Sequence, residues 1–352
     1  MKIESLHIET IAPLIAPQHI KQELPISPQQ QQFVWHCREK IAYTLSRKDK
    51  RLLLVVGPCS VHDITGIREY ASKLKALADE VSETFIPVLR VYFEKPRSAH
   101  GWKGILHDPH LNGTPQIETG IRMTRQILLE MAALGIPTAA EILDPLGCYY
   151  FDDLLAWGCI GARTSASQIH RQLASGLPMP IGFKNSIEGC VETAVNAIKS
   201  ARHSHAYIGL NQSGAAAIIH SRGNPNTHLV LRGGSTGPNF DALSIQKAVA
   251  KLAHQNLPTG LMIDCSHDNS QKQHEKQVNV FEYVIDLYRS GHEEIIGLQL
   301  ESHLLAGRQP YAIGQKPQAG LSITDACLDW DATHKLIYDS HLLLNRALCA
   351  NG

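Results

Sequence analysis

Short apolar runs alternate with helical patterns along most of the chain. From Arg51 onward the runs are rich in β-branched residues, and helical patterns separate them. This alternation is typical of βα units that build a parallel sheet. The predicted strands are Leu52–Val56, Ile86–Phe93, Thr138–Leu143, Cys159–Arg163, Pro180–Lys184, His228–Arg232, Gly260–Cys265 and Ile295–Leu300.

One interruption separates the fifth and sixth predicted strands. Ala206–Leu210 and Ala215–His220 flank Asn211-Gln212-Ser213-Gly214, and they lie too close together for a helix, so they predict an inserted β-hairpin. Eight parallel strands with interleaved helices favour a closed α/β barrel, the TIM (β/α)₈ fold, over an open doubly wound sheet. The chain also lacks the GxGxxG and GxxxxGK[ST] motifs that would favour the open sheet.

The amino-terminal part of the chain follows another pattern. Ile3–Ile26 is a mixed apolar stretch interrupted by prolines. Ser27, Pro28 and Gln30 then supply an N-cap, a proline at the first helical position and the third-position partner of a capping box. An apolar residue recurs at every fourth position of one helical face: Phe33, Cys37, Ile41 and Leu45.

Length and composition fit one large barrel with additions. The chain has 352 residues and 43% hydrophobic content, and α/β barrels commonly exceed ~200 residues as a single domain. We expect residues 1–46 to form an extension for oligomer formation or regulation, and residues 47–352 to form the catalytic barrel. Residues 206–222 are expected to be its inserted regulatory hairpin.

Charge and cysteine content narrow the class of protein. Lys plus Arg and Asp plus Glu each number 33, so no overall charge would attract nucleic acid or an anionic membrane surface. We find no apolar run of 18 residues and no charged-then-apolar leader, so the expected location is the cytoplasm. Eight cysteines are scattered without framework spacing, which predicts reduced thiols.

Chemically active side chains stand at or just beyond the carboxyl end of every predicted strand. In a (β/α)₈ barrel these ends meet at one mouth, where active sites are built. A single charged residue there is more often an ordinary solvated loop residue, but a complete set is improbable on that reading. In chain order the set is Cys59, Arg90, Lys95, Arg97, Glu141, Arg163, Lys184, Arg232, His267, Glu301 and Asp325.

Part of this set is cationic. Cations gathered in one barrel mouth repel one another unless anions neutralise them, so the substrates should be strongly anionic. Two phosphates and one carboxylate would balance such a site, because Arg recognises these groups bidentately and Lys supplies a point charge or a proton. The cations are Arg90, Lys95, Arg97, Arg163, Lys184 and Arg232.

The remaining side chains suit a metal ion. Cys59, His267, Glu301 and Asp325 combine sulfur, nitrogen and oxygen donors, which suits Mn²⁺, Fe²⁺, Co²⁺ or Zn²⁺ better than Mg²⁺ or Ca²⁺. Taken singly, Cys59 would be a small buried hydrophobe and His267 a hydrogen-bonded loop histidine. Their shared position at strand ends favours one divalent ion, and Cys265, two residues before His267, is the residue most easily mistaken for a ligand.

Several local sequences together match one enzyme family. They are GPCSVHD (57–63), RVYFEKPR (90–97), GWKG (101–104), IGART (160–164), GFKN (182–185), LRGG (231–234), IDCSH (263–267) and SITDAC (322–327). Together these stretches span nearly the whole chain. They closely resemble the type I 3-deoxy-D-arabino-heptulosonate 7-phosphate (DAHP) synthases, which start the shikimate pathway.

The resemblance implies a reaction and a role for each site residue. Phosphoenolpyruvate would condense with erythrose 4-phosphate and release phosphate, with one divalent metal ion on Cys59, His267, Glu301 and Asp325. Phosphoenolpyruvate would lie against Arg90, Arg163, Lys184 and Arg232. Arg97 and Ser98 would hold the phosphate of erythrose 4-phosphate, with Lys95 between the two substrates. Glu141 and Lys184 would flank a water near the enol carbon.

The resemblance also implies feedback inhibition and a homodimer or homotetramer. In the related enzymes the hairpin and the extension of a neighbouring subunit form a pocket for an aromatic amino acid. Gly209 stands where phenylalanine-sensitive relatives carry Ser, which predicts tyrosine as the effector, although Gly209 could simply permit a strand bulge. The residues expected around this pocket are Pro145, Cys148, Tyr149, Leu177, Pro178, Tyr207, Gly209 and Ile219.

A few positions depart from the family pattern, and two rival functions stay open. Ser98 replaces a usual Thr, Ala166 replaces a usual Glu, and Asp268 adds a carboxylate beside His267 that is a candidate for tuning metal affinity. One rival is a sister enzyme that uses arabinose 5-phosphate, against which Lys95-Pro96-Arg97 and the hairpin argue. The other is a non-catalytic barrel that senses an aromatic amino acid, against which the complete set of ligands argues.

Overall fold

A computed structural model describes residues 7–350 of the chain, with side chains described up to residue 346. The bounds expected for the extension and the barrel, 1–46 and 47–352, include residues 1–6 and 351–352, which lie outside the described part. The start of the apolar stretch at Ile3 and the side chain of Cys349 lie outside it as well.

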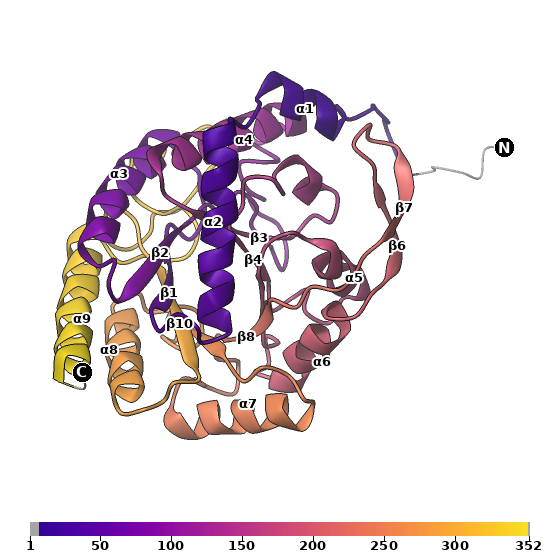
Figure 1. The fold of residues 1–352 in the computed structure, drawn as a ribbon. Coiled ribbons are helices and arrows are strands. Elements are labelled where there is room, and N and C mark those ends of the chain that lie inside the picture. The colour runs from indigo at the N-terminus through magenta and orange to yellow at the C-terminus, as the bar shows by residue number, and fades with distance from the viewer. Residues whose placement is uncertain (1–6, 351–352) are drawn as a thin grey trace.

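Eight parallel strands close into a barrel (Figure 1). Around the barrel their order is β1-β10-β9-β8-β5-β4-β3-β2, and β1 pairs with β10 to complete the circle. The predicted TIM fold is therefore confirmed. The strands are β1 (Leu52–Gly57), β2 (Phe85–Arg90), β3 (Thr138–Glu141), β4 (Trp157–Ile160), β5 (Ile181–Lys184), β8 (Thr227–Leu231), β9 (Leu261–Asp264) and β10 (Ile295–Glu301).

Three predicted strands extend two or three residues too far toward the mouth. Strand β2 is predicted to reach Phe93 but ends at Arg90, and β3 is predicted to reach Leu143 but ends at Glu141. Strand β4 is predicted over Cys159–Arg163 but ends at Ile160. Phe93 is buried against the ring of Phe151, with 4.8 Å between ring centroids, so it packs a loop instead of the sheet. A run of apolar residues indicates that a segment is buried, but a buried segment need not pair with a neighbouring strand.

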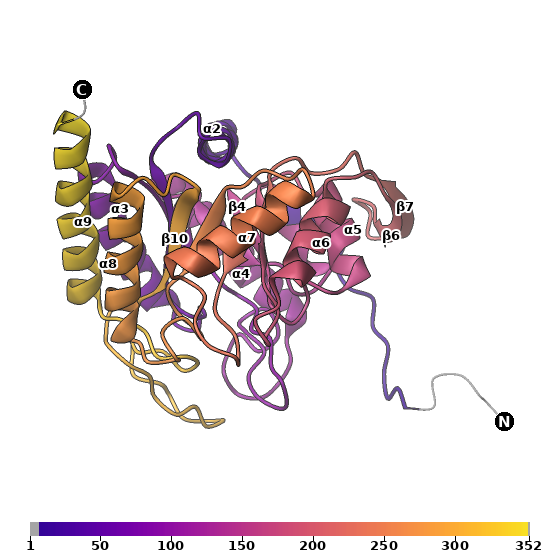
Figure 2. The ribbon, with the colours of Figure 1, turned by 90° about the horizontal axis from the view of Figure 1, so that it is seen from below.

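Helices surround the barrel and a further helix closes one end of it. The surrounding helices bury one face each; in α3, for example, Ile67, Tyr70 and Leu74 are buried at helical spacing. Figures 1 and 2 show them outside the strands. They are α3 (Ile64–Glu80), α4 (Ile117–Leu134), the short 3₁₀ helix η1 (Gly147–Tyr150), α5 (Gln168–Gly176), α6 (Val191–Ala201), α7 (Ala242–His254), α8 (Lys276–Arg289) and α9 (Trp330–Ala350).

The closing helix is α2 (Pro28–Leu45), and it begins as predicted. The Ser27 hydroxyl accepts a hydrogen bond from the Gln30 amide at 3.2 Å, and the Ser27 amide donates to Gln30 Oε1 at 2.8 Å. Ile41 is fully buried in a cluster with Leu53 and Trp157 of the barrel. Figure 2 shows α2 end-on, at the opposite end of the barrel from the long loops. The site must therefore open on the loop side.

The extension and the hairpin lie next to each other in the same chain. The hairpin consists of β6 (Ala206–Leu210) and β7 (Ala216–His220), paired antiparallel as predicted. A short helix that the sequence analysis did not anticipate, α1 (Pro17–Glu23), begins at Pro17 beside the hairpin (Figure 1). The Gln18 amide donates to the Gln212 carbonyl at 2.9 Å. The tip of the hairpin is thus bonded to the extension.

Within the residues that the structure describes, none of the helices combines the length and the apolar character that a membrane crossing demands.

Candidate active site

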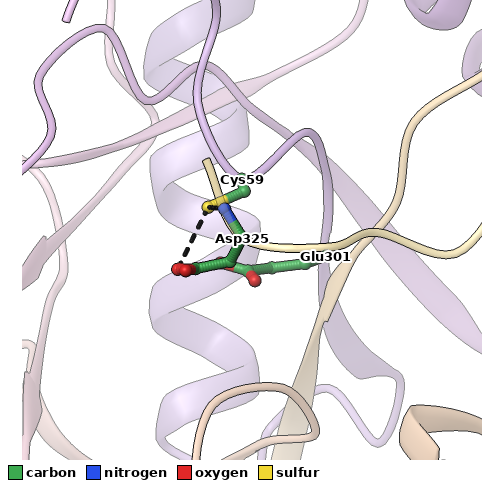
Figure 3. A group of neighbouring side chains, drawn as sticks. All are labelled: Cys59, Glu301 and Asp325. Atoms are coloured by element: carbon green, nitrogen blue, oxygen red, sulfur yellow. Dashed lines mark hydrogen bonds between the residues drawn. The ribbon is translucent and has the colours of Figure 1, made fainter. Parts of the chain in front are cut away.

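Three predicted metal ligands come together at the mouth of the barrel. Their ligand atoms, one each from Cys59, Glu301 and Asp325, all lie within 4.8 Å of one another (Figure 3). Cys59 follows β1 and Glu301 ends β10, which are neighbouring strands, while a returning loop supplies Asp325. The hydroxyls of Ser60 and Thr324 lie 2.8 Å apart and tie that loop to the end of β1.

The fourth predicted ligand, His267, lies beside this trio. Its Nε2 is 3.8 Å from Glu301 Oε1, and it lines a small cavity of about 40 Å³ together with Glu301 and Asp325. The His267 backbone has a φ of 56°, in the left-handed region that non-glycine residues adopt rarely. Such strained residues concentrate at functional sites, because surrounding contacts hold them there.

Lys95 occupies the centre of the same group. Its Nζ lies 2.8 Å from Cys59 Sγ and 3.0 Å from Asp325 Oδ2. Burial alone would lower the pKa of Lys95, but Cys59 and Asp325 raise it above its ordinary value. In turn, Lys95 holds the pKa of Asp325 well below its usual range. The lysine is therefore charged, and it balances acidic groups that would otherwise repel one another.

The residues present fit a divalent cation. Cys59 is fully buried, and burial together with Glu301 raises the pKa of its thiol well above the ordinary value, so a further positive charge is needed to ionise it. A thiol, an imidazole nitrogen and two carboxylates around one point are a donor set typical of transition metal sites. Cys59, Glu301 and Asp325, with His267 adjacent, could hold such an ion.

Arg90 is buried under the site. Its side chain is 1% exposed, with Nη2 at 3.1 Å from Glu301 Oε1 and Nε at 3.3 Å from the Pro58 carbonyl. The guanidinium carbon also lies 3.9 Å from the centroid of the Tyr92 ring. These contacts fix the plane of the guanidinium group at the bottom of the mouth.

The residues predicted for the sugar phosphate lie on the exposed side of the mouth. Arg97 is exposed and lines an open cavity of about 1040 Å³ between the loops that contain Trp102 and Tyr311. Ser98 accepts hydrogen bonds from Arg163 Nη2 at 3.1 Å and Nε at 3.3 Å. Arg163 and Ser98, which were predicted to serve different substrates, are therefore direct neighbours.

Lys184 leads to a residue that the sequence analysis missed. Its Nζ donates to Asp264 Oδ2 at 2.7 Å, and the His267 Nδ1 lies 2.9 Å from the same oxygen. Asp264 is fully buried at the end of β9. The sequence did contain a signal for Asp264: it is a carboxylate inside an apolar strand, three residues before the predicted ligand His267. A buried carboxylate needs charged or hydrogen-bonding partners, so such a residue indicates a polar site nearby.

Arg232 and Glu141 complete the mouth. Arg232 Nη1 forms an ion pair with Asp268 Oδ2, so Asp268 contacts a predicted substrate cation, although sequence analysis had considered it for the metal. Glu141 ends β3 and packs over Gly161, where an added Cβ would lie 2.1 Å from its Oε1. A side chain at position 161 would therefore displace this carboxylate from the mouth.

The remaining cysteines stay outside the group. Cys265 is fully buried in the core on the outer side of β9, together with Leu261 and Ile263. The expectation that it shares the inward direction of His267 is therefore wrong. Among the residues with described side chains, the seven cysteines form no disulfide. Cys190 alone among them is exposed.

Comparison with known proteins gives the family. A family model described as the DAHP synthetase I family matches residues 23–337, which is most of the chain. The chain belongs to the DAHP synthetase I family.

Relatives within the DAHP synthetase I family differ in the effector that their names give. The chain is 41% identical over 352 residues to "Phospho-2-dehydro-3-deoxyheptonate aldolase, Tyr-sensitive" of Escherichia coli (strain K12), covering 99% of this chain and 98% of the relative. It is also 41% identical over 334 residues to the Phe-sensitive enzyme of the same organism, covering 95% of each. Overall identity therefore does not discriminate between effectors.

A solved structure agrees with the fold. The phospho-2-dehydro-3-deoxyheptonate aldolase of Francisella tularensis SCHU S4 superimposes with a TM-score of 0.93 at 40% identity, covering 96% of this chain and 98% of the other. The eight-stranded barrel of this DAHP synthetase I family member is thus shared with a structure of the same family.

The residues predicted for an effector pocket gather where η1 meets the hairpin. A Cβ added to Gly209 would lie 2.2 Å from Tyr149 Oη and 2.8 Å from Ile219 Cγ1, so these side chains already fill the space beside Gly209. Tyr207 points to α5, where an added Cβ at Gly176 would lie 2.8 Å from its hydroxyl. The other predicted residues lie around them: Pro145, whose carbonyl accepts from the buried Cys148, the buried Leu177 and the exposed Pro178.

Proposed function

We propose that this chain catalyses the DAHP synthase reaction. Phosphoenolpyruvate, D-erythrose 4-phosphate and water give 3-deoxy-D-arabino-heptulosonate 7-phosphate and phosphate, the first step of the shikimate pathway. The observation that carries this proposal is a group of side chains that could hold one metal ion, in a member of the DAHP synthetase I family. The predicted substrate-binding cations belong to the same barrel mouth.

The predicted metal ligands would hold an ion that supplies Lewis acidity. Cys59, His267, Glu301 and Asp325 would hold one divalent ion, and the mixed donors favour Mn²⁺, Fe²⁺, Co²⁺ or Zn²⁺. When bound, the ion would polarise the aldehyde oxygen of erythrose 4-phosphate. Lys95 contacts two of these ligands, so it lies where the two substrates would meet.

Fixed cations would hold the two anionic substrates. Arg90, Arg163, Lys184 and Arg232 would bind phosphoenolpyruvate, because guanidinium and ammonium groups form strong charge-assisted hydrogen bonds with phosphate and carboxylate. Arg90, Lys184 and Arg232 are buried, whereas Arg163 is exposed. Arg97 and Ser98 would bind the phosphate of erythrose 4-phosphate. The contact between Arg163 and Ser98 supports adjacent pockets, since one cation and one hydroxyl would lie between the two substrates.

The reaction would proceed in three steps, and protein groups would assist the first two. Holding the substrates side by side lets C3 of phosphoenolpyruvate attack the aldehyde carbon, which leaves positive character at C2. Glu141 and Lys184 would orient a water that adds at C2, with Glu141 accepting its proton. The resulting hemiketal phosphate expels inorganic phosphate by cleavage of the C–O bond.

An assay of phosphoenolpyruvate consumption tests this proposal against its rivals. We expect consumption with erythrose 4-phosphate, loss of activity with a chelator and recovery with a divalent metal ion. A preference for arabinose 5-phosphate would favour the sister enzyme. No consumption with either sugar phosphate, combined with binding of an aromatic amino acid, would favour the non-catalytic sensor.

Regulation and assembly form the second part of the proposal. An aromatic amino acid, tyrosine in the first instance, would inhibit by binding near the hairpin at 206–222, and the extension of residues 1–46 would support a homodimer or homotetramer of this cytoplasmic enzyme. The support is the contact of the extension with the hairpin and the exposure of apolar side chains on both, such as Ile11 at 81% and Ile208 at 84%.

A further inference from the structure

One buried carboxylate touches both halves of the proposed site. Asp264 Oδ2 accepts from Lys184 Nζ at 2.7 Å and lies 2.9 Å from His267 Nδ1. Its Oδ1 accepts from the Ser266 hydroxyl at 2.6 Å and from the Ser266 amide at 3.0 Å. The Asp264 side chain is fully buried, so all these partners are protein groups that hold it in one orientation.

The hydrogen bonds around His267 decide which of its nitrogens carries the proton. Nδ1 lies 2.7 Å from Ser266 Oγ and 2.9 Å from Asp264 Oδ2. The Ser266 hydroxyl gives its own proton to Asp264 Oδ1, so both neighbours of Nδ1 are acceptors. Nδ1 must therefore carry a proton, and the lone pair of Nε2 is left to face Glu301, 3.8 Å away.

The same carboxylate keeps Lys184 charged. Burial alone would lower the pKa of Lys184, but Asp264 raises it above the ordinary value of a lysine. The Lys184 side chain is 4% exposed, so the amine has little contact with solvent. Without an anion beside it, a lysine in this position would tend to lose its proton and its value as an anion ligand.

We propose that Asp264 is a positioning residue shared by the two halves of the site: it orients His267 toward the metal and holds Lys184 toward phosphoenolpyruvate. This inference rests on the proposed function, because it assumes that both ligands bind at this mouth. Carboxylates that accept from a metal-bound histidine fix its orientation and raise its basicity, and their loss typically weakens metal binding about 10- to 100-fold.

The variant Asp264→Asn tests the shared role because it keeps the shape and removes the charge. The amide offers one acceptor and one donor in place of two acceptors, so it cannot satisfy both Lys184 and His267. Asp268→Asn is the matched control. Asp268 lies on the same loop and pairs with Arg232, so its loss should alter phosphoenolpyruvate binding while Mn²⁺ affinity stays within about threefold of wild type.

Two binding measurements on chelator-treated full-length protein give the readout. Mn²⁺ affinity is measured by electron paramagnetic resonance, and phosphoenolpyruvate affinity by isothermal titration calorimetry in the presence of saturating Mn²⁺. For Asp264→Asn we expect Mn²⁺ to bind about 10- to 100-fold more weakly. Phosphoenolpyruvate should also bind at least about tenfold more weakly, because Lys184, which would hold it, loses its charged hydrogen-bond partner.

Each outcome decides between the inference and the proposed function. If wild type binds neither Mn²⁺ nor phosphoenolpyruvate, the proposed function fails and this inference with it. If wild type binds both, and Asp264→Asn binds either one with unchanged affinity, the shared role alone is overturned. Should Asp264→Asn not fold, Ser266→Ala decides: it removes one donor to Asp264, so it should weaken Mn²⁺ in the same direction by a smaller factor, and unchanged affinity would overturn the inference.

Discussion

The chemistry of Cys59 depends on the charges around it. Its thiol is buried beside Glu301 and Asp325, which oppose ionisation, and Lys95 is the cation in contact with it. A bound divalent ion would supply the remaining positive charge and make the thiolate a strong ligand. This residue should therefore respond to substitution as a ligand does, and not as a buried hydrophobe.

We predict that Cys59→Ser abolishes turnover while the fold remains intact, because a soft thiolate is replaced by a weak neutral donor of similar size. Metal content by atomic absorption, steady-state rates and circular dichroism measure the three quantities. Cys265→Ser is the control, since Cys265 is equally buried but faces the outer core, and it should keep its metal and its activity. A Cys59→Ser protein that retains metal and activity would remove Cys59 from the site.

Arg232→Ala should weaken phosphoenolpyruvate far more than erythrose 4-phosphate. The substitution removes a charge-assisted partner of one anion, which is worth on the order of 10- to 100-fold in affinity. Arg97→Ala should show the reverse pattern, because Arg97 lies on the exposed side of the mouth near Ser98. KM values for both substrates in both variants give the answer, and an equal loss for the two substrates would contradict separate pockets.

Residues at the strand ends could be predicted from the sequence because their position follows from the order of strands alone. Cys59, Glu301 and Asp325 come together although more than 200 positions separate Cys59 from the other two. Asp264 was missed for a physical reason. It is the last residue of a buried apolar strand, and the pattern used to predict site residues selects side chains at or beyond the strand ends that face the mouth, so it does not identify a buried partner of those side chains. The pairing of Arg232 with Asp268 depends on side-chain orientation, which no sequence pattern gives.

Among the elements, the hairpin and the helix α2 were predictable and α1 was not. The hairpin has the turn residues Asn211-Gln212-Ser213-Gly214 between two apolar runs, and α2 has a complete capping box, so local chemistry determines both. Helix α1 spans only seven residues of mixed pattern, and contacts outside it hold it in place. One such contact is the ion pair of Lys21 with Asp152, at 2.6 Å.

The hairpin carries the prediction about regulation. We expect tyrosine to inhibit wild type more strongly than phenylalanine or tryptophan, and Gly209→Ser to shift this preference toward phenylalanine. A side chain at 209 would meet Tyr149 Oη at 2.2 Å and force that ring to move, so Ser would change the wall of the predicted effector pocket. Inhibition curves with the three amino acids measure the effect.

Ala206→Ser is the control for this experiment. Ala206 lies at the start of the same strand on its exposed face, so an added hydroxyl there should leave effector preference unchanged. An unaltered preference in Gly209→Ser would contradict the argument from pocket size, whichever effector wild type prefers.

A histidine in strand β8 should make stability depend on pH. Burial lowers the pKa of His228 to about 4, and its Nε2 accepts a hydrogen bond from Trp157 Nε1 at 3.2 Å. The unfolded chain binds the proton first, so His228 favours folding above its unfolded pKa of about 6.5, and this advantage is lost as the pH falls toward 4.

Denaturant unfolding at two pH values tests this. Between pH 7.5 and pH 5, wild type should lose about 2 kcal/mol more stability than His228→Gln, which keeps an acceptor but does not titrate. His303, whose pKa burial also lowers to about 4, stays in both proteins and provides the common background. An identical loss in the two proteins would show that His228 does not contribute.

For the whole molecule, one end of the barrel is sealed and the other carries the chemistry. Helix α2 packs across the amino ends of the strands, while the long loops lie at the opposite end (Figure 2). The predicted metal ligands Cys59, Glu301 and Asp325 come together at that opposite end, the carboxyl ends of the strands. The sequence predicts this polarity because βα order alone determines which ends carry loops that face the mouth. How subunits assemble depends on surface complementarity between copies, so the predicted homodimer or homotetramer stays a prediction.

The central claim is that this mouth joins phosphoenolpyruvate to erythrose 4-phosphate through C3 and releases phosphate by C–O cleavage. The most direct test uses phosphoenolpyruvate with ¹⁸O in the oxygen that bridges C2 and phosphorus. With erythrose 4-phosphate and Mn²⁺, mass spectrometry should find one seven-carbon sugar phosphate for each phosphate released, with the ¹⁸O in the released phosphate and no turnover with a chelator. Absence of the seven-carbon product, or ¹⁸O retained in the sugar, would contradict the account.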